Sequence, residues 1–147
     1  MENNHSVLNN YLVEFFNAIL RIEENSLEAM DNNLSLREMH TIEAIINSTD
    51  KNVGDIASKL NITMGTLSVA LKTLENKGYI SREKVENDRR QVKVFATEKG
   101  LEVNRRHQAF HHTMVDEIIS YVSAKELEVL MIGLDKLNKH FYNLDKL

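Results

Sequence analysis

The stretch that decides the fold runs from residue 56 to residue 100 and reads IASKLNITMGTLSVALKTLENKGYISREKVENDRRQVKVFATEKG. It predicts a short helix over 53–60, a tight link at Asn61-Ile62, and a second helix that Thr63 caps and Gly78 ends. A short helix, a brief link and a longer helix form the pattern of a helix-turn-helix. We therefore expect the second helix to enter the major groove of DNA.

The start of that second helix is rich in small and hydroxyl side chains, which let a helix sit deep in a groove. Backbone amides at a helix start can meet a phosphate, and short hydroxyls can bond base edges or phosphate oxygens. The DNA contacts predicted on this helix are Thr63, Gly65, Thr66, Ser68 and Lys72. Taken singly, each of them is also consistent with a helix cap or a solvated position.

After this helix the apolar period changes to two, which predicts strands over 79–85 and 91–96. The loop between them, residues 86–90, makes a hairpin with a charged tip. Arg89 and Arg90 on a thin β-ribbon suit the minor groove, where the negative potential is strong. Asp88 is placed to pair with one of the two guanidinium groups and so to fix the loop. The alternative is an exposed turn that only promotes solubility.

Apolar stripes at helical spacing flank this region on both sides, and they predict helices over about 6–30, 35–46, 97–122 and 123–144. Two of these helices open on a capping-box pattern, Ser35 with Glu38 and Ser123 with Glu126. The last one carries a near-heptad apolar seam. The predicted fold is mainly α with a two-stranded β-hairpin wing, a winged helix-turn-helix between N- and C-terminal helices.

Charge is distributed unevenly along the chain. The net charge is −4, but it is −7 over residues 1–58, +5 over 59–106 and −2 over 107–147. A basic middle segment is expected of a phosphate-binding surface, although chance clustering on a solvated face gives the same count.

The sequence has no cysteine, which excludes disulfides and thiolate metal sites. It shows no apolar run of the roughly 20 residues that span a bilayer. The first residues also show no basic leader with an apolar core. We therefore expect a cytoplasmic protein with no membrane contact.

The stretch 56–100 resembles the MarR family of regulators, and the resemblance extends along nearly the whole chain. Its most specific pieces are LENKGYI at 74–80, NDRR at 87–90 and ATEKG at 96–100. The resemblance implies a homodimer formed by residues 1–34 and 101–147, with the winged helix-turn-helix at 35–100, all in one compact domain. It also implies double-stranded DNA as the partner. Two copies would read a pseudo-palindrome through the helix residues named above and through Arg89 and Arg90, with Asp88 supporting the wing.

Three shorter pieces resemble a branch of that family that represses fatty-acid-synthesis genes: REMHTIEAI at 37–45, TMGT at 63–66 and RRHQAFHHTMVDEII at 105–119. This narrower resemblance implies a corepressor, a long-chain acyl group on acyl carrier protein (acyl-ACP). An apolar small ligand is the more general expectation. The residues expected to line the effector site are Ile19, Met39, His40, His107, Phe110 and His111.

The histidines have a second interpretation. His107 and His111 are four residues apart on a helix and share a face, a spacing that metal ligands use. The resemblance adds that zinc-sensing members of the family use histidines near the joint of the second and fifth helices. With His40 and an acidic residue such as Glu23, Glu24 or Glu43, they form an alternative zinc site. Histidines hydrogen-bonded at a helix interface are the simpler explanation, and with it no cofactor is expected.

Two other classes of protein compete with a DNA-binding regulator. An enzyme is disfavoured because the sequence offers no Ser/His/Asp arrangement, no glycine-rich phosphate loop and no carboxylate cluster beside a histidine pair. We therefore expect no catalytic residues. A dimerising interaction module without DNA binding is disfavoured by the basic hairpin tip and the small residues of the second helix.

Overall fold

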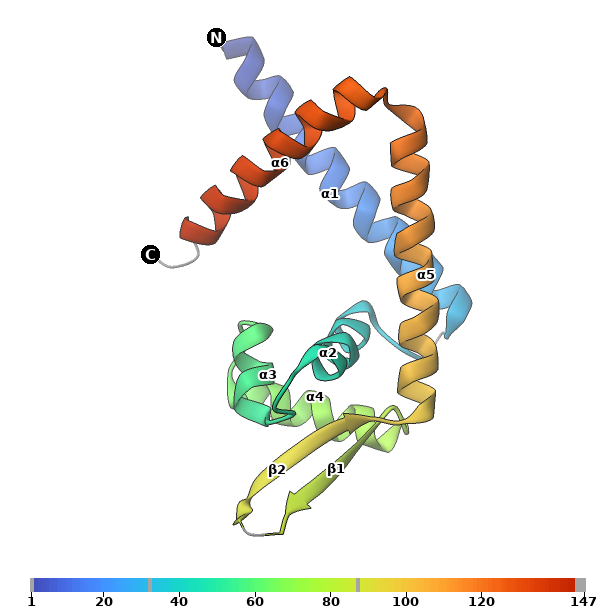
Figure 1. Ribbon diagram of the computed structural model, residues 1–147, viewed down its shortest axis with the longest axis vertical. Helices are drawn as coiled ribbons and strands as arrows, with labels where there is room; N and C mark the ends of the chain where they lie inside the picture. Colours follow the sequence, from blue (N-terminus) through green and yellow to red (C-terminus); the bar gives the residue numbers. More distant parts are fainter. Residues whose placement is uncertain (1, 32, 87, 145–147) are drawn as a thin grey trace. The chain divides into compact units, whose positions relative to one another are not determined.

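The computed structural model describes residues 2–31, 33–86 and 88–144, without the side chains of residues 2 and 88–90. In chain order the described residues form α1 (Glu2–Met30), α2 (Leu36–Asn47), α3 (Val53–Lys59), α4 (Met64–Asn76), β1 (Ile80–Val85), β2 (Asp88–Ala96), α5 (Glu98–Tyr121) and α6 (Ala124–Leu144) (Figure 1). This order confirms the predicted mainly α fold with a hairpin wing. The chain divides into two compact units, residues 1–108 and 109–147, which we call the N-terminal and C-terminal units.

The predicted caps begin the helices where the sequence placed them. The Ser35 hydroxyl accepts a hydrogen bond from the Glu38 amide (3.3 Å), and the Ser35 amide donates to the Glu38 carboxylate (2.8 Å). Ser123 and Glu126 form the same reciprocal pair at the start of α6. Each capping box supplies partners for amides that a helix start leaves without intrahelical acceptors.

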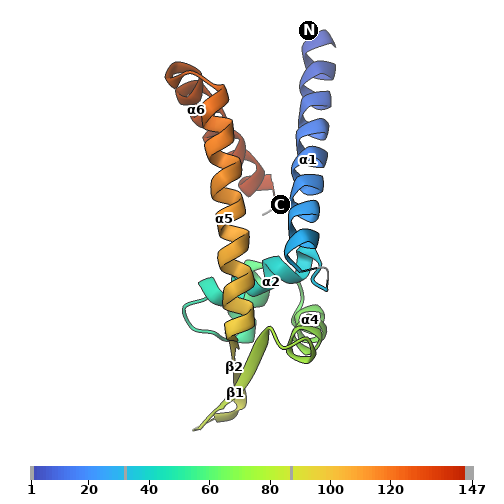
Figure 2. The same cartoon turned by 90° about the vertical axis from the view of Figure 1, so that its right-hand side faces the viewer.

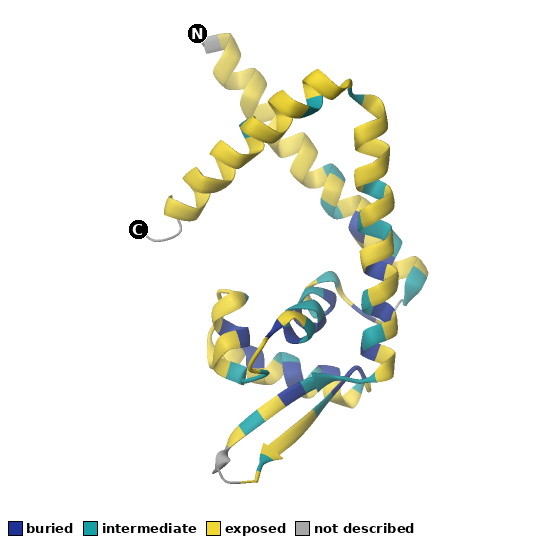
Figure 3. Cartoon of the chain, viewed as in Figure 1, coloured by how far each residue is buried: buried dark blue, intermediate teal, exposed yellow. Residues whose placement is uncertain are grey.

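The core of the N-terminal unit lies where α2, α3, α4 and the base of the hairpin meet, as the dark blue segments of Figure 3 show. Its fully buried side chains include Met39, Ile42, Ile45, Ile56, Leu67, Leu74 and Val94. Burying each such side chain contributes on the order of 1.5–3 kcal/mol. The end of α1 joins this core through Leu27, which is 2% exposed. Part of the segment 1–34, which is expected to form the dimer, therefore also packs against the core of its own chain.

β1 and β2 form an antiparallel hairpin that projects from the end of the N-terminal unit farthest from the start of α1 (Figure 2). Its base is attached to the link before α3, because the Val94 amide donates to the Lys51 carbonyl (2.9 Å). The predicted loop 86–90 was too long, since β2 already begins at Asp88, which pairs with Val85. The register shifts between Lys84 and Val85, and such an irregularity lets one strand carry extra residues near the tip.

The first half of α1 and the whole of α6 bury almost nothing within one chain (Figure 3). Large apolar side chains on α1 are exposed, among them Leu12 (42%), Phe15 (63%), Phe16 (64%) and Ile19 (44%). In the C-terminal unit, α6 exposes Val129, Leu130, Met131, Ile132, Leu134, Leu137, Phe141, Tyr142 and Leu144. Among the helices of the described residues, none is long and apolar enough to cross a membrane.

Candidate nucleic-acid interface

A tight turn sets α4 against α3. α3 ends at Lys59, and the amide of the C-cap residue Leu60 donates to the Ile56 carbonyl (3.1 Å). Asn61 then adopts a left-handed conformation with φ 52°. Asparagine tolerates that conformation better than most residues. The Ile62 amide donates to the Ala57 carbonyl (3.1 Å), so the chain enters α4 only four residues after the end of α3. This is the helix-turn-helix predicted from the sequence.

The start of α4 is capped by the side chain of Thr63. Its hydroxyl accepts from the Thr66 amide (3.1 Å) and lies 2.9 Å from the Thr66 hydroxyl. The two predicted contact residues are thus tied to each other. They present a pair of hydroxyl groups at the positive end of the helix dipole, where phosphate oxygens are favoured.

Gly65 lies in the first turn of α4 and is exposed. A Cβ atom there would meet nothing closer than the Thr63 hydroxyl oxygen at 3.9 Å, so the fold itself has room for a side chain. The absence of a side chain instead leaves the backbone of this turn open to a molecule outside the protein.

The outer face of α4 runs from the first turn toward its end. Leu67, Leu71 and Leu74 are buried on the inner face. Opposite them lie the exposed residues Gly65, Val69 and Lys72, because a helix turns by about 100° per residue. Val69 was not singled out from the sequence, although its spacing from the three leucines already places it on this outer face.

Ser68 lies at the edge of this outer face rather than at its centre. It lines a hollow between α3, α4 and the hairpin, together with Met64, Arg82 and Gln91. The Arg82 guanidinium is held there by Glu75 of α4, at 3.2 Å. Ser68 therefore belongs to the side of α4 that faces the wing.

The wing itself is only partly described. Backbone positions Asp88, Arg89 and Arg90 belong to β2, but their side chains lie outside the described residues. The predicted minor-groove contacts of Arg89 and Arg90, and the supporting pairing of Asp88, remain predictions.

The far end of α4 closes in a hydrogen-bond pattern that depends on Gly78. This glycine has φ 80°, the left-handed conformation, and its amide donates to the Glu75 carbonyl (3.0 Å). The Tyr79 amide donates to the Leu74 carbonyl (2.9 Å). Together these two bonds make a Schellman motif, which stops the helix and turns the chain into β1.

A cluster of histidine and carboxylate side chains lies at the other side of the N-terminal unit, where α1, α2 and α5 meet. His40, Glu43 and His107 each offer one ligand atom, and these atoms lie within 4.8 Å of one another. The rings of His40 and His107 have centroids 5.9 Å apart. His107 is fully buried. The Gln108 amide donates to the Glu43 carboxylate, which further joins α5 to α2.

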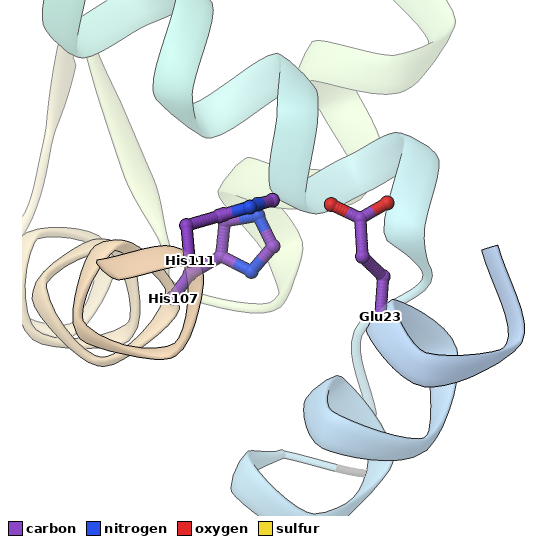
Figure 4. Close-up of side chains that lie close together, drawn as sticks. All are labelled: Glu23, His107 and His111. Carbon is purple, nitrogen blue, oxygen red and sulfur yellow. The ribbon is translucent and has the colours of Figure 1, made fainter. Parts of the chain in front are cut away.

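Glu23 of α1 approaches the same cluster. It is 6% exposed, and one of its carboxylate oxygens lies within 4.8 Å of a ring nitrogen of His107 (Figure 4). His111 is drawn one helical turn after His107 on α5 (Figure 4), as their four-residue spacing predicts. Glu23 and Glu43 are two of the three carboxylates that the sequence offered as partners for the histidines.

The remaining effector candidates differ widely in exposure. Met39 is fully buried in the core of the N-terminal unit, whereas Ile19 is 44% exposed on α1. Phe110 and His111, in the C-terminal unit, are half-buried and their ring centroids lie 5.3 Å apart.

Comparison with known proteins identifies this arrangement. A MarR family model matches residues 34–92. The structure is similar to that of FabT from Streptococcus pneumoniae, solved in complex with DNA, with 38% identity, a TM-score of 0.91, and coverage of 95% of this chain and 99% of FabT. The chain belongs to the MarR family. It is accordingly a helix-turn-helix transcription regulator and not an enzyme.

Two further relatives agree with that assignment. The helix-turn-helix-type transcriptional regulator YfiV of Bacillus subtilis is 27% identical over 119 residues, which cover 81% of this chain and 74% of YfiV. MepR from Staphylococcus aureus, solved as a DNA complex, shares the MarR fold with a TM-score of 0.71 at 23% identity, and the match covers 89% of this chain and 96% of MepR.

Proposed function

We propose that this MarR protein is a repressor that binds double-stranded DNA as a homodimer on a pseudo-palindromic operator. The observation that carries the proposal is the outer face of α4, where hydroxyls, an open glycine backbone and Lys72 are exposed together at and beyond a capped helix start. These groups suit phosphate and base-edge contacts. FabT and MepR, solved with DNA, support the same role.

The exposed apolar faces of α1 and α6 support the dimer. Apolar surface on this scale is costly in water and is typical of a protein interface. A second copy of the chain would cover it. The two copies of α4, about 34 Å apart, would then enter successive major grooves on one face of the duplex.

A gel-shift titration at several salt concentrations tests DNA binding. Affinity for selected operator duplexes should fall steeply with salt, because each neutralised phosphate releases counterions. Lys72→Ala should flatten the slope by about two contacts per dimer. Lys125→Ala, at an exposed position of α6, is the matched control and should leave the slope unchanged. An operator affinity that changes neither with salt concentration nor with Lys72→Ala would contradict the proposal.

We further propose that acyl-ACP with a long acyl chain is the corepressor. The resemblance to fatty-acid-synthesis repressors and the similarity to FabT support this. The distance between the two copies of α4 would differ between the DNA-bound and the free conformation of the dimer. The effector must bind one of these two conformations more tightly than the other, since a ligand shifts an equilibrium only by its differential affinity. Titration with acyl-loaded carrier protein should tighten operator binding, and the unloaded carrier protein should not. Equal affinities in both titrations would contradict this part of the proposal.

Zinc sensing is the second candidate function. The cluster of His40, Glu43 and His107 supports it, because imidazole nitrogens and carboxylate oxygens are zinc ligands and three of them converge. Purified protein loaded with zinc and dialysed should retain about one ion per subunit, and His40→Ala together with Glu43→Gln should remove it. No retained zinc in the unsubstituted protein would leave the histidines as interface residues.

A further inference from the structure

Val69 presents an unusual side chain at the centre of the outer face of α4. It is 70% exposed, more than any apolar side chain of α1. It lies about 200° around the helix from Leu67, and its helical neighbours at three residues' distance are Thr66 and Lys72. The side chain therefore points away from the core and stands between two of the predicted DNA contacts.

Folding gives no reason for valine at this position. A β-branched side chain loses rotamer freedom in a helix, and an exposed one gains little from burial. Alanine, lysine or glutamate would suit an exposed helical position better. An apolar, branched group at this position suits a contact with an apolar group outside the chain.

We propose that Val69 reads the methyl group of a thymine in the operator. This inference rests on the proposed function, because it requires α4 to lie in the major groove. The thymine C5-methyl is the apolar group that the four base pairs present there, and apolar side chains contact it. The hydroxyls of Thr66 and the ammonium of Lys72 serve hydrogen bonds on either side, while Val69 supplies an apolar surface of matching size.

The proposal predicts a specific sequence preference. Each half-site should contain a thymine at one fixed position, and Val69 should distinguish thymine from uracil there. Uracil keeps the base pairing and the hydrogen-bonding edge of thymine and lacks only the methyl group. Loss of one buried methyl should weaken binding about fourfold at each half-site.

The experiment uses duplexes that the unsubstituted protein selects from a randomised library. Each thymine of the selected site is replaced in turn by uracil, and affinities are measured for the unsubstituted protein and for Val69→Ala. The unsubstituted protein should lose about fourfold at one position per half-site, and Val69→Ala should lose nothing at that position. Repeating the selection with Val69→Ala should relax the preference at the same base pair alone.

Lys72→Ala is the matched control on the same face of the helix. It should weaken binding to all duplexes and keep the thymine-to-uracil difference, because a phosphate contact carries no sequence information. Thermal unfolding should show that Val69→Ala folds normally, since the replaced side chain is mostly exposed. If Val69→Ala keeps the uracil effect, or if no thymine matters to the unsubstituted protein, Val69 does not read a methyl group. If no duplex is selected at all, the proposed function fails as well.

Discussion

Tyr79 lies at the point where the ends of three helices meet. Its hydroxyl donates to the Asp31 carboxylate just after α1, and its carbonyl accepts from the Thr97 amide (3.0 Å) just before α5. The Lys99 ammonium lies 4.1 Å from the centroid of its ring. The hydrogen bond from Tyr79 lowers the pKa of Asp31, and burial raises the pKa of Tyr79. One buried side chain thus connects α1, the end of α4 and α5.

Tyr79→Phe removes this hydrogen bond and keeps the ring. We expect the free energy of unfolding to fall by about 1–2 kcal/mol, because the Asp31 carboxylate loses the Tyr79 hydroxyl and keeps only the Asn33 amide as a hydrogen-bond donor among the described residues. Urea unfolding followed by circular dichroism measures the difference. Tyr121→Phe, at a side chain that is 90% exposed, is the control and should change little. Equal stability of the two variants would show that the hydroxyl contributes nothing.

Asp31 also makes stability depend on pH. Because its pKa is lower in the folded protein than in the unfolded chain, its contribution is present above the ordinary carboxyl pKa of about 3.9 and is lost as pH falls through the folded value. The unsubstituted protein should therefore exceed Asp31→Asn in stability at pH 7, and the two should converge below about pH 4. Unfolding titrations at a series of pH values test this. If the difference in stability between the unsubstituted protein and Asp31→Asn stays constant down to pH 3, the ionised carboxylate is not its source.

At the scale of elements, α4 shows a conflict between stability and binding. Gly65→Ala should raise the thermal midpoint, because alanine in a helix is favoured over glycine by up to about 1 kcal/mol and the added methyl meets open space. The same methyl should weaken operator binding by about tenfold if the backbone of this turn approaches DNA closely. Asn76→Ala, at the exposed end of α4, is the control and should leave operator affinity unchanged. Unaltered affinity of Gly65→Ala would show that the first turn stays clear of the duplex.

The elements that could be predicted from the sequence are those governed by local rules. Ser35 and Thr63 cap the starts of α2 and α4 through their own hydroxyls, and Gly78 ends α4 in the left-handed conformation that other residues rarely adopt. These three helix boundaries could therefore be predicted. The start of β2 at Asp88 could not be predicted, because it depends on a shift in the pairing between the two strands. The convergence of Glu23, Glu43 and His107 from three helices was likewise only an option in the sequence, since tertiary packing decides which residues meet.

Across the whole molecule, most of the basic residues and most of the large exposed apolar side chains lie in different segments of the chain. The basic residues gather over 59–106, which includes α4, the hairpin and the first turns of α5, whereas residues 1–58 carry a net −7. The acidic segment includes α1, which exposes large apolar side chains such as Leu12, Phe15 and Phe16. The proposed phosphate-binding surface and the proposed dimer surface thus lie in different parts of the sequence. A substitution on α1 should therefore abolish the dimer and leave the proposed DNA-contacting surface of each subunit intact.

Phe16→Glu tests that separation. Phe16 is 64% exposed on α1, and a carboxylate there would have to be buried without a partner in a dimer, which costs several kcal/mol. We expect a monomer by analytical ultracentrifugation and a thermal midpoint that no longer rises with protein concentration, as it should for the unsubstituted dimer. Operator affinity should fall by at least about a hundredfold, because each half-site must then be bound separately.

Asn10→Glu adds the same charge to the same helix and serves as the control, since Asn10 lies across α1 from Leu12 and Ile19. It should remain dimeric and bind the operator normally. Phe16→Glu should also keep the helix content. The salt slope of its residual DNA binding should be about half that of the dimer, because one copy of α4 instead of two then contacts phosphates. A dimeric Phe16→Glu protein with full operator affinity would mean that the apolar face of α1 serves some other partner. The two copies of α4 would then have to be held together by surfaces other than this one.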